Sequence, residues 1–293
     1  MKYNKIGVIG AGVIGRGVAQ SFAQTGHSVV LLDVSASILD DAKSDIARGL
    51  RLSSLTDPTL RGLNHAEILS RIGFTTDYAH LAETEFVVEN VTENWDVKEA
   101  VYRSLDRICP EHCIFAVNTS AIPIARVAAI TSRPASVIGI HFMNPVPKKQ
   151  FVELITSEHT GADTVKVTLE ILEQLGKKAI FVNDQPGFVS NRIMMLMINE
   201  SIATLADGVA TAEAVDSIFV NCFAHKMGPL ATADLIGLDT ILHTLDVLHD
   251  SYRSPKFEAC SLLRDMVQSG RLGRKSGRGF FEYNNLTAGS NGH

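Results

Sequence analysis

The stretch Lys5-Ile-Gly-Val-Ile-Gly-Ala-Gly-Val-Ile-Gly15 decides the fold. Its first half is a short apolar run typical of a buried β-strand, and its second half is rich in glycine. The residues that follow, up to Gly26, have a helical pattern. A second apolar run, Ser28 to Leu32, comes next and ends at Asp33. This order predicts a strand, a glycine-rich turn, a helix and a parallel strand, which together form one crossover unit of about 30 residues.

The glycines of this turn have the spacing of a dinucleotide-binding site. Gly10 permits a tight turn, Gly12 lets a pyrophosphate approach the backbone, and Gly15 lets the helix pack closely on the strand. The N-terminus of the helix then offers unpaired N–H groups to the phosphates. Asp33 is placed to accept hydrogen bonds from the adenosine ribose, and its charge would repel the 2′-phosphate of NADP. The sequence therefore predicts an NAD site at Gly10, Gly12, Val13, Ile14, Gly15 and Asp33.

Strand-like runs and helical patterns alternate along the first part of the chain. Helical patterns such as Trp95 to Ile108 and Asp163 to Leu175 fit between the runs. Strands that alternate with helices predict an α/β fold. We expect a Rossmann domain built on a doubly wound, mostly parallel sheet. The further strand-like runs are Phe86–Val88, Ile114–Val117, Val137–Ile140, Val152–Ile155 and Ala179–Val182.

The pattern changes near Gln185, where a Pro-Gly pair interrupts regular structure. From Phe188 to Ala206 the apolar spacing is helical, and strand-like runs are scarce until Gly279 to Tyr283. We therefore expect an NAD-binding Rossmann domain at residues 1–184 and an all-α C-terminal domain at residues 185–293.

Composition excludes several classes of protein. The chain has 293 residues, which suggests two domains at roughly 150 residues each. Its 27 basic and 32 acidic residues give a net charge of -5, so a nucleic-acid partner is not expected. No apolar run approaches the roughly 18 residues that a membrane span needs. The 4 cysteines include no Cys-x-x-Cys pair, which suits free thiols in a reducing cytoplasm and indicates no metal site.

Three polar clusters are candidates for the chemistry. Asn118-Thr-Ser120 and His141-Phe-Met-Asn-Pro145 follow predicted strands, whose carboxyl ends bind ligands in open α/β sheets. The third cluster, Gly187 to Arg192, lies at the expected domain boundary. Oxidation of an alcohol with NAD needs a base, and a histidine with a carboxylate partner such as Glu153 suits that role. Spacing alone leaves open whether these clusters converge.

These motifs resemble the 3-hydroxyacyl-CoA dehydrogenase family, including its single-function 3-hydroxybutyryl-CoA dehydrogenases. The resemblance extends over almost the full length, and the motifs stand in the family's order. They are the glycine-rich turn, Glu89-Asn-Val-Thr-Glu93 with Lys98, Asn118-Thr-Ser120, His141 to Pro147, Phe151-Val-Glu153, Gly187 to Arg192, Met227-Gly-Pro-Leu230, Asp234 to Asp239 and Leu272 to Phe281.

The resemblance implies hydride transfer between NAD and C3 of a short 3-hydroxyacyl-CoA. It implies that His141 is the acid and base, that Glu153 is its partner, and that Ser120 and Asn191 bind the hydroxyl or carbonyl and the thioester end. It also implies a homodimer formed through the helical domain. The contacts that it implies for the nicotinamide half of NAD are Glu93, Lys98, Asn118, Asn144 and Lys275.

One stretch departs from the family and leaves the acyl carrier open. Family members usually have a lysine-rich stretch after the second helix, directed at the 3′-phospho-ADP of CoA. Here Arg48 to Arg61 contains arginines but no lysine, and Asp57-Pro58 is inserted. Ala121 and Lys226 also depart from the family pattern. A related branch acts on hydroxyacyl groups held on acyl carrier protein and makes hydroxymalonyl-, methoxymalonyl- or aminomalonyl-type units for polyketides, so this carrier is the alternative.

Two other classes are weaker interpretations. The 3-hydroxyisobutyrate and 6-phosphogluconate dehydrogenases use a catalytic lysine early in their helical domain, and no lysine occurs here between Ala179 and His225. A non-catalytic NAD sensor would bind NAD without turnover.

Overall fold

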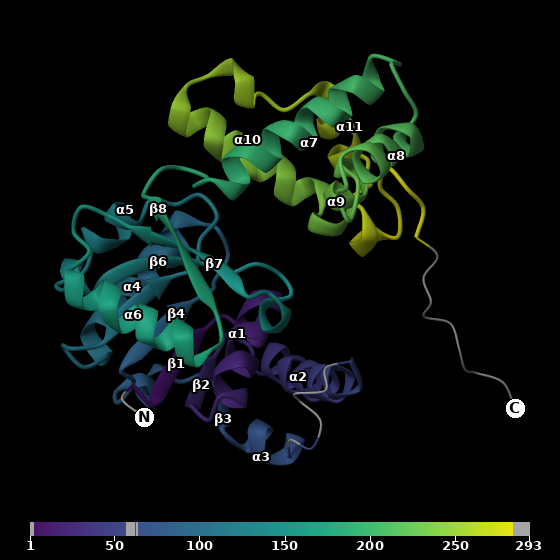
Figure 1. Ribbon diagram of the computed structural model, residues 1–293. Coiled ribbons are helices and arrows are strands. Elements are labelled where there is room, and N and C mark those ends of the chain that lie inside the picture. Colours follow the sequence, from purple (N-terminus) through teal and green to yellow (C-terminus); the bar gives the residue numbers. More distant parts are fainter. Residues whose placement is uncertain (1–2, 57–61, 63, 284–293) are drawn as a thin grey trace, which may run out of the picture. The chain divides into compact units, whose positions relative to one another are not determined.

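The computed structural model of the protein describes residues 3–56, 62 and 64–283 (Figure 1). The chain divides into two compact units, Met1–Gln185 and Pro186–His293, and each is described by itself. Asp57, Pro58 and Arg61 of the departing stretch lie outside the described residues.

The first unit is built on one eight-stranded sheet. Its strands are β1 (Lys5–Ile9), β2 (Ser28–Leu32), β3 (Ile72–Thr75), β4 (Phe86–Glu89), β5 (Ile114–Val117), β6 (Val137–His141), β7 (Phe151–Thr156) and β8 (Lys178–Asn183). They lie in the order β3-β2-β1-β4-β5-β6-β7-β8. The strands β1 to β6 are mutually parallel, whereas β7 runs antiparallel to β6 and parallel to β8. This topology confirms the predicted Rossmann fold.

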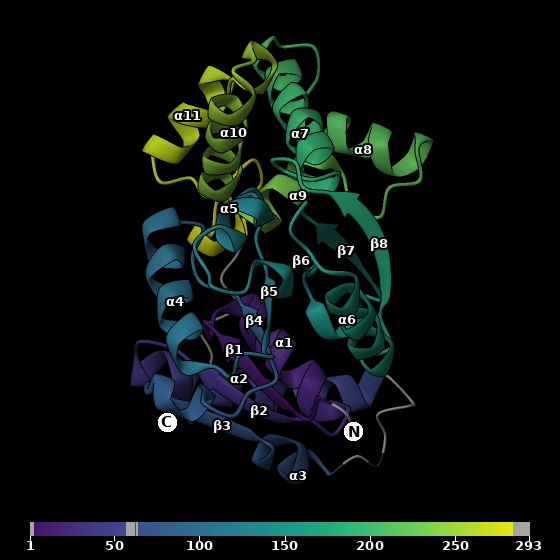
Figure 2. The same ribbon diagram turned by 90° about the vertical axis from the view of Figure 1, so that its left-hand side faces the viewer.

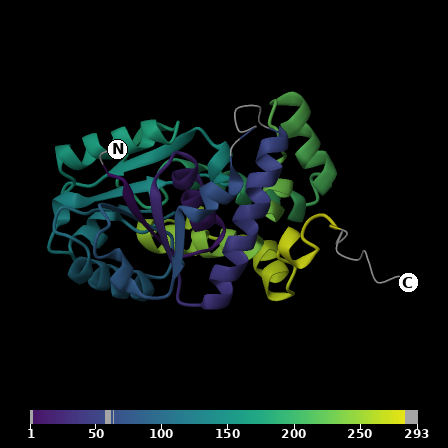
Figure 3. The ribbon, with the colours of Figure 1, turned by 90° about the horizontal axis from the view of Figure 1, so that it is seen from below.

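Helices cover both faces of this sheet. They are α1 (Val13–Gln24), α2 (Ala36–Thr56), α3 (His65–Ser70), α4 (Trp95–Ile108), α5 (Ile124–Ala128) and α6 (Ala162–Gln174), with short 3-10 turns η2 (Tyr78–Leu81), η3 (Pro134–Ser136) and η4 (Val146–Lys148). Figures 2 and 3 show α4 and α6 on opposite faces. Because both faces are covered, β4 and β5 are buried at every residue, as expected for central parallel strands.

The second unit is helical, as predicted. Its helices are α7 (Ser190–Ala206), α8 (Ala212–Cys222), α9 (Pro229–Ile236), α10 (Leu238–Tyr252) and α11 (Ser261–Gln268), with η5 (Pro255–Phe257) and η6 (Arg274–Ser276). Their apolar faces form one core that includes Ile198, Leu230, Leu245 and Phe257. Within the described residues, no helix has both the length and the apolar character that a membrane span requires.

The structure differs from the sequence-based expectations at two places, one expected strand that does not form and one strand that the pattern does not predict. The run Gly279 to Tyr283 forms no strand and contributes only an isolated bridge between Arg278 and Glu282. The reason is the buried carboxylate of Asp234, which accepts the N–H groups of this run at Phe280 and Phe281, 3.0 and 2.9 Å away. The pattern also does not predict β3, a four-residue edge strand with a glycine at its second position.

A buried histidine makes the stability of the first unit depend on pH. His27 is 0% exposed, and its ring lies 3.0 Å from the Gln174 side-chain oxygen and 3.2 Å from the Phe22 carbonyl. Burial lowers the pKa of His27 below its ordinary value. The unfolded chain therefore binds a proton more readily, so this contribution to stability is complete above the unfolded pKa of about 6.5 and is lost as pH falls below it.

We expect the free energy of unfolding to fall on going from about pH 7.5 to about pH 5.5, and to fall less in His27→Gln. Urea unfolding at both pH values measures the difference. The matched control is His112→Gln at an exposed histidine. Equal pH dependence in the His27 variant and the wild type would contradict this assignment.

Candidate active site

The glycine-rich turn between β1 and α1 has the shape that a pyrophosphate requires. Gly10 has a positive φ of 89°, and a Cβ on Gly15 would lie 1.8 Å from the Gly10 carbonyl oxygen. A Cβ on Gly12 would meet nothing within 4 Å, so the backbone there is open. Gly12 is also the N-cap of α1, and no side chain of the described residues caps that helix end. Its N–H groups therefore suit a phosphate.

A cavity of about 320 Å³ adjoins this turn, and Asp33, the predicted ribose-binding acid, lines it. Gly12, Asp33 and Tyr78 are among the residues that line it. Asp33 Oδ2 accepts a hydrogen bond from the Ala11 N–H at 2.8 Å, and Oδ1 accepts one from the Ser35 N–H at 3.3 Å. The carboxylate is thus fixed at the cavity, and this arrangement fits the adenosine half of a dinucleotide.

His141 and Glu153 face each other across the antiparallel pair of β6 and β7. They are direct partners in the register, so their side chains lie on the same face of the sheet. His141 Nδ1 lies 2.7 Å from Glu153 Oε2, and the two residues are only 9% and 6% exposed. Because an ionised carboxylate only accepts hydrogen bonds, Nδ1 carries the proton and the neutral ring has its acceptor at Nε2. This arrangement suits a histidine that acts as acid and base with an orienting carboxylate.

The Ser120 segment after β5 is held by Glu93. One carboxylate oxygen, Oε1, accepts the N–H groups of Ser120, Ala121 and Ile122 at 3.2, 3.0 and 3.2 Å. The same oxygen accepts the hydroxyl of Thr119. A single carboxylate thus determines the backbone path of the segment that presents Ser120.

Asn118 joins the ends of three neighbouring strands. Its side-chain N–H donates to Asn90 Oδ1 at 2.9 Å, and its Oδ1 accepts the Phe142 N–H at 3.1 Å. Asn90 follows β4, and Phe142 follows His141 at the end of β6. Both polar atoms of the Asn118 amide are therefore bonded within the protein, and they fix Asn118 beside Phe142, the residue that follows His141.

Lys98 lies inside the first unit. Its ammonium is 2.9 Å from each carboxylate oxygen of Glu89, and both side chains are 0% exposed. Burial raises the pKa of Glu89, and the charge of Lys98 acts in the opposite direction. The Lys98 ammonium also lies 3.4 Å from the Asn118 carbonyl oxygen. This ion pair therefore lies directly behind the strand ends that carry the candidate site.

Two further predicted side chains belong to the second unit. Asn191 is in the first turn of α7, after Gly187 and Phe188, which both have positive φ values. Lys275 is in η6, and its ammonium lies 2.6 Å from Asp239 Oδ2.

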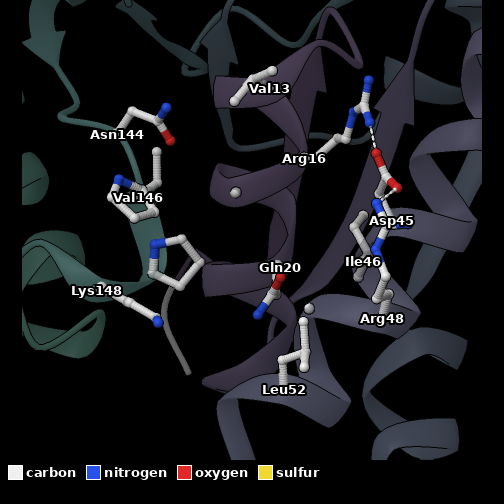
Figure 4. A pocket seen from close by; sticks show the side chains of 14 residues that line it. Val13, Arg16, Gln20, Asp45, Ile46, Arg48, Leu52, Asn144, Val146 and Lys148 are labelled. Carbon is white, nitrogen blue, oxygen red and sulfur yellow. Dashed lines mark hydrogen bonds and ion pairs between the residues drawn. The ribbon is translucent and has the colours of Figure 1, made fainter. Parts of the chain in front are cut away.

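A second cavity of about 320 Å³, which we call the α1–α2 groove, lies on another side of α1 (Figure 4). In this view Val13 and Gln20 of α1 lie between Val146 and Lys148 on one side and Asp45 and Arg48 on the other. The predicted residues Val13 and Asn144 line this groove rather than the cavity beside Asp33. Arg16 Nη1 forms an ion pair with Asp45 Oδ2, and Asp45 Oδ1 lies 2.5 Å from Arg48 Nη2.

The η4 wall of the groove is anchored by a buried lysine. Lys177 Nζ donates to the carbonyl oxygens of Val146 and Lys149 at 2.6 and 2.7 Å. Burial lowers the pKa of Lys177 to about 8. On the other side of this wall, a Cβ on Gly17 would lie 2.9 Å from Val146 Cβ, so α1 and η4 are in close contact. Sequence patterns do not point to Lys177 or Arg16. The spacing of Asp45 and Arg48 along α2 is typical of an ion pair on one face of a helix.

Comparison with known proteins identifies the family. The model of the 3-hydroxyacyl-CoA dehydrogenase NAD-binding domain matches residues 5–185, and that of the C-terminal domain matches residues 187–283. The chain belongs to the 3-hydroxyacyl-CoA dehydrogenase family. The resemblance inferred from the sequence motifs is therefore confirmed.

Relatives in this family match the chain over nearly its whole length. A probable 3-hydroxybutyryl-CoA dehydrogenase of Deinococcus radiodurans is 45% identical, and the match covers 95% of this chain and 100% of the relative. A 3-hydroxybutyryl-CoA dehydrogenase of Clostridioides difficile is 39% identical, with 96% and 99% covered. The crystal structure of (S)-3-hydroxybutyryl-CoA dehydrogenase PaaH1 from Ralstonia eutropha is similar with a TM-score of 0.89, at 40% identity and with 97% and 100% covered.

Proposed function

We propose that this protein is an NAD-dependent dehydrogenase of short 3-hydroxyacyl-CoA thioesters such as 3-hydroxybutyryl-CoA. The observation that carries the proposal is the His141–Glu153 pair, buried and 2.7 Å apart at the end of β6. Because β1 and β6 belong to the parallel part of the sheet, this pair and the glycine-rich turn are at the same edge. The names of the relatives support this substrate class.

The cofactor is held by the turn and its acid. Gly10 makes the tight turn, Gly12 leaves the backbone open to the pyrophosphate, and Gly15 lets α1 pack against the turn. Asp33 binds the ribose hydroxyls. Bound NAD supplies the acceptor for the hydride that leaves C3. Toward the nicotinamide half we assign Glu93, Asn118, Asn144 and Lys275, and Lys98 acts from behind through Glu89.

The chain's own residues handle the proton. In oxidation, His141 Nε2 takes the proton of the C3 hydroxyl as the C3–H bond breaks and the carbonyl forms. Glu153 keeps the Nδ1 proton on the opposite side of the ring and stabilises the imidazolium that results. Ser120 and Asn191 orient the C3 oxygen and the thioester end. In reduction, the protonated His141 returns the proton to the same oxygen.

The remaining assignments follow from this proposal. Residues 1–184 bind NAD. Residues 185–293 complete the substrate site and form the interface of a homodimer. The enzyme is cytoplasmic. CoA is the proposed carrier of the acyl group, and acyl carrier protein is the alternative.

NADH formation from 3-hydroxybutyryl-CoA tests the proposal. The same acyl group is offered on CoA and on acyl carrier protein, with NAD as the oxidant. We expect NADH to form, with a higher kcat/KM for the CoA thioester than for the thioester on acyl carrier protein. A higher kcat/KM on acyl carrier protein would reassign the carrier. NAD binding with no NADH formed on either carrier would overturn the enzymatic function.

Asp33 should determine the choice between NAD and NADP. Placing a 2′-phosphate beside this carboxylate costs several kcal/mol, so we expect kcat/KM with NAD to exceed that with NADP by about 100-fold. Asp33→Asn keeps an acceptor for the Ala11 N–H but removes the charge. This variant should therefore lower the ratio of kcat/KM with NAD to kcat/KM with NADP. Asp41→Asn, at an exposed acid on α2, is the control. Similar rates with both cofactors in the wild type would show that Asp33 does not face the ribose.

A further inference from the structure

The Ser120 segment, which connects β5 to the short helix α5, is held at its far end by Asp184. This acid follows β8, and its two carboxylate oxygens accept the first two N–H groups of α5, those of Ile124 and Ala125, at 2.9 and 2.7 Å. The N-cap of α5 is Pro123, whose side chain forms no capping bond. A carboxylate 60 residues further along the chain therefore supplies the cap of this helix.

The capped end of α5 lies against the strand that carries the candidate base. Ile124 is 0% exposed, and a Cβ on Gly139 of β6 would lie 2.7 Å from its Cδ1 atom. Gly139 and His141 occupy alternate positions of one strand, so their Cα–Cβ bonds point to the same face of the sheet. Ile124 therefore packs on the face of β6 from which the His141 side chain projects. Because α5 begins only a few residues after Ser120, the Asp184 bonds restrict the position of Ser120 relative to His141.

Two acids together determine the path of this part of the chain. Glu93 accepts the N–H groups of residues 120–122, and Asp184 accepts those of residues 124 and 125, while Pro123 has none. Every backbone N–H in this stretch thus bonds to a carboxylate from another part of the chain. Such bonds are roughly twice as strong as neutral ones, so they suit a segment that must hold a hydroxyl in one place.

We propose that Asp184 is a positioning residue, which keeps the Ser120 hydroxyl at the C3 oxygen of the substrate by fixing the start of α5. This inference rests on the proposed function. Without the two bonds α5 loses its cap, and a helix of five residues has few hydrogen bonds of its own to keep its start in place. Ser120 would then move relative to the reacting oxygen, and a misplacement of about 1 Å can cost about 100-fold in rate.

The test measures kcat and KM for 3-hydroxybutyryl-CoA in Asp184→Asn, whose side chain has one oxygen left for the two N–H groups. We expect kcat to fall about tenfold and KM to change by less than about twofold. The same change made in Ser120→Ala should lower kcat little further, because the effect of Asp184 passes through the Ser120 hydroxyl. An equal loss of kcat in both backgrounds, or an unchanged kcat in the single variant, would overturn the proposal.

Asp216→Asn is the matched control. Asp216 accepts the N–H groups of Leu230 and Ala231 at 2.8 Å each, a similar pair of bonds near the start of α9 in the second unit. This variant should lose stability, as Asp184→Asn does, but should keep its kcat. An equal fall in kcat in the two variants would show that Asp184 acts through stability alone and would contradict the proposal.

Amide hydrogen exchange provides a readout that needs no turnover. Peptides that cover residues 119–125 should exchange faster in Asp184→Asn than in the wild type, and at the wild-type rate in Asp216→Asn. Unchanged exchange in Asp184→Asn would overturn the proposal. If the wild type forms no NADH from any 3-hydroxyacyl thioester, the proposed function fails, while the exchange measurement still decides whether Asp184 holds the Ser120 segment.

Discussion

His141→Ala should lower kcat by about 100-fold or more, the size expected when a general acid–base group is lost. The Kd for NAD should stay nearly unchanged, because His141 lies on β6 and does not line the cavity beside Asp33. Glu153→Gln should lower kcat less, since the amide keeps a hydrogen-bond acceptor but loses the charge that stabilises the imidazolium.

Steady-state kinetics with 3-hydroxybutyryl-CoA and a separate NAD titration measure these effects. His159→Ala, at an exposed histidine in the same unit, is the matched control and should leave kcat unchanged. Near-normal turnover in His141→Ala would contradict the assignment of the base, and a large loss of NAD binding would point to a structural defect instead.

Lys98→Met should produce the largest loss of stability among these variants. The change leaves the fully buried Glu89 carboxylate without its cation, and breaking such a pair costs about 3–5 kcal/mol. Removing both charges at once should be far milder, because a neutral pair avoids the uncompensated charge. Glu89→Gln suits the double variant, since its amide oxygen still accepts the Val91 N–H.

Urea unfolding of the single and double variants measures this difference. Arg103→Met on the same helix removes the exposed pair with Glu99, and should cost at most about 1 kcal/mol. A single Lys98→Met variant as stable as the double variant would show that Glu89 is not held as a charged group.

The fold was largely predictable because its signals are local. The glycine-rich turn, the apolar run that ends at Asp33 and the helix Trp95–Ile108 are each specified by neighbouring residues. The run Gly279 to Tyr283 has a strand-like pattern but forms no strand, because the N–H groups of Phe280 and Phe281 bond to Asp234, a partner distant in sequence. Patterns within a segment contain no information about such a partner.

The candidate site was predictable in its residue types but not in its contacts. The spacing of His141 and Glu153 along the chain cannot show that they are register partners, because their pairing depends on how the chain reverses direction between β6 and β7. The bonds of Asn118 to the ends of two other strands depend on the order of strands in the sheet. The cations of the α1–α2 groove come from three elements, so they become a cluster only when those elements pack together.

Isotope transfer tests the central claim most directly. Wild-type protein is incubated with NAD and 3-hydroxybutyryl-CoA that carries deuterium at C3, and the NADH formed is analysed by mass spectrometry. We predict NADH with one deuterium and the corresponding 3-ketoacyl thioester in equal amounts. NADH without deuterium, or no NADH from a protein that binds both NAD and the thioester, would contradict the account.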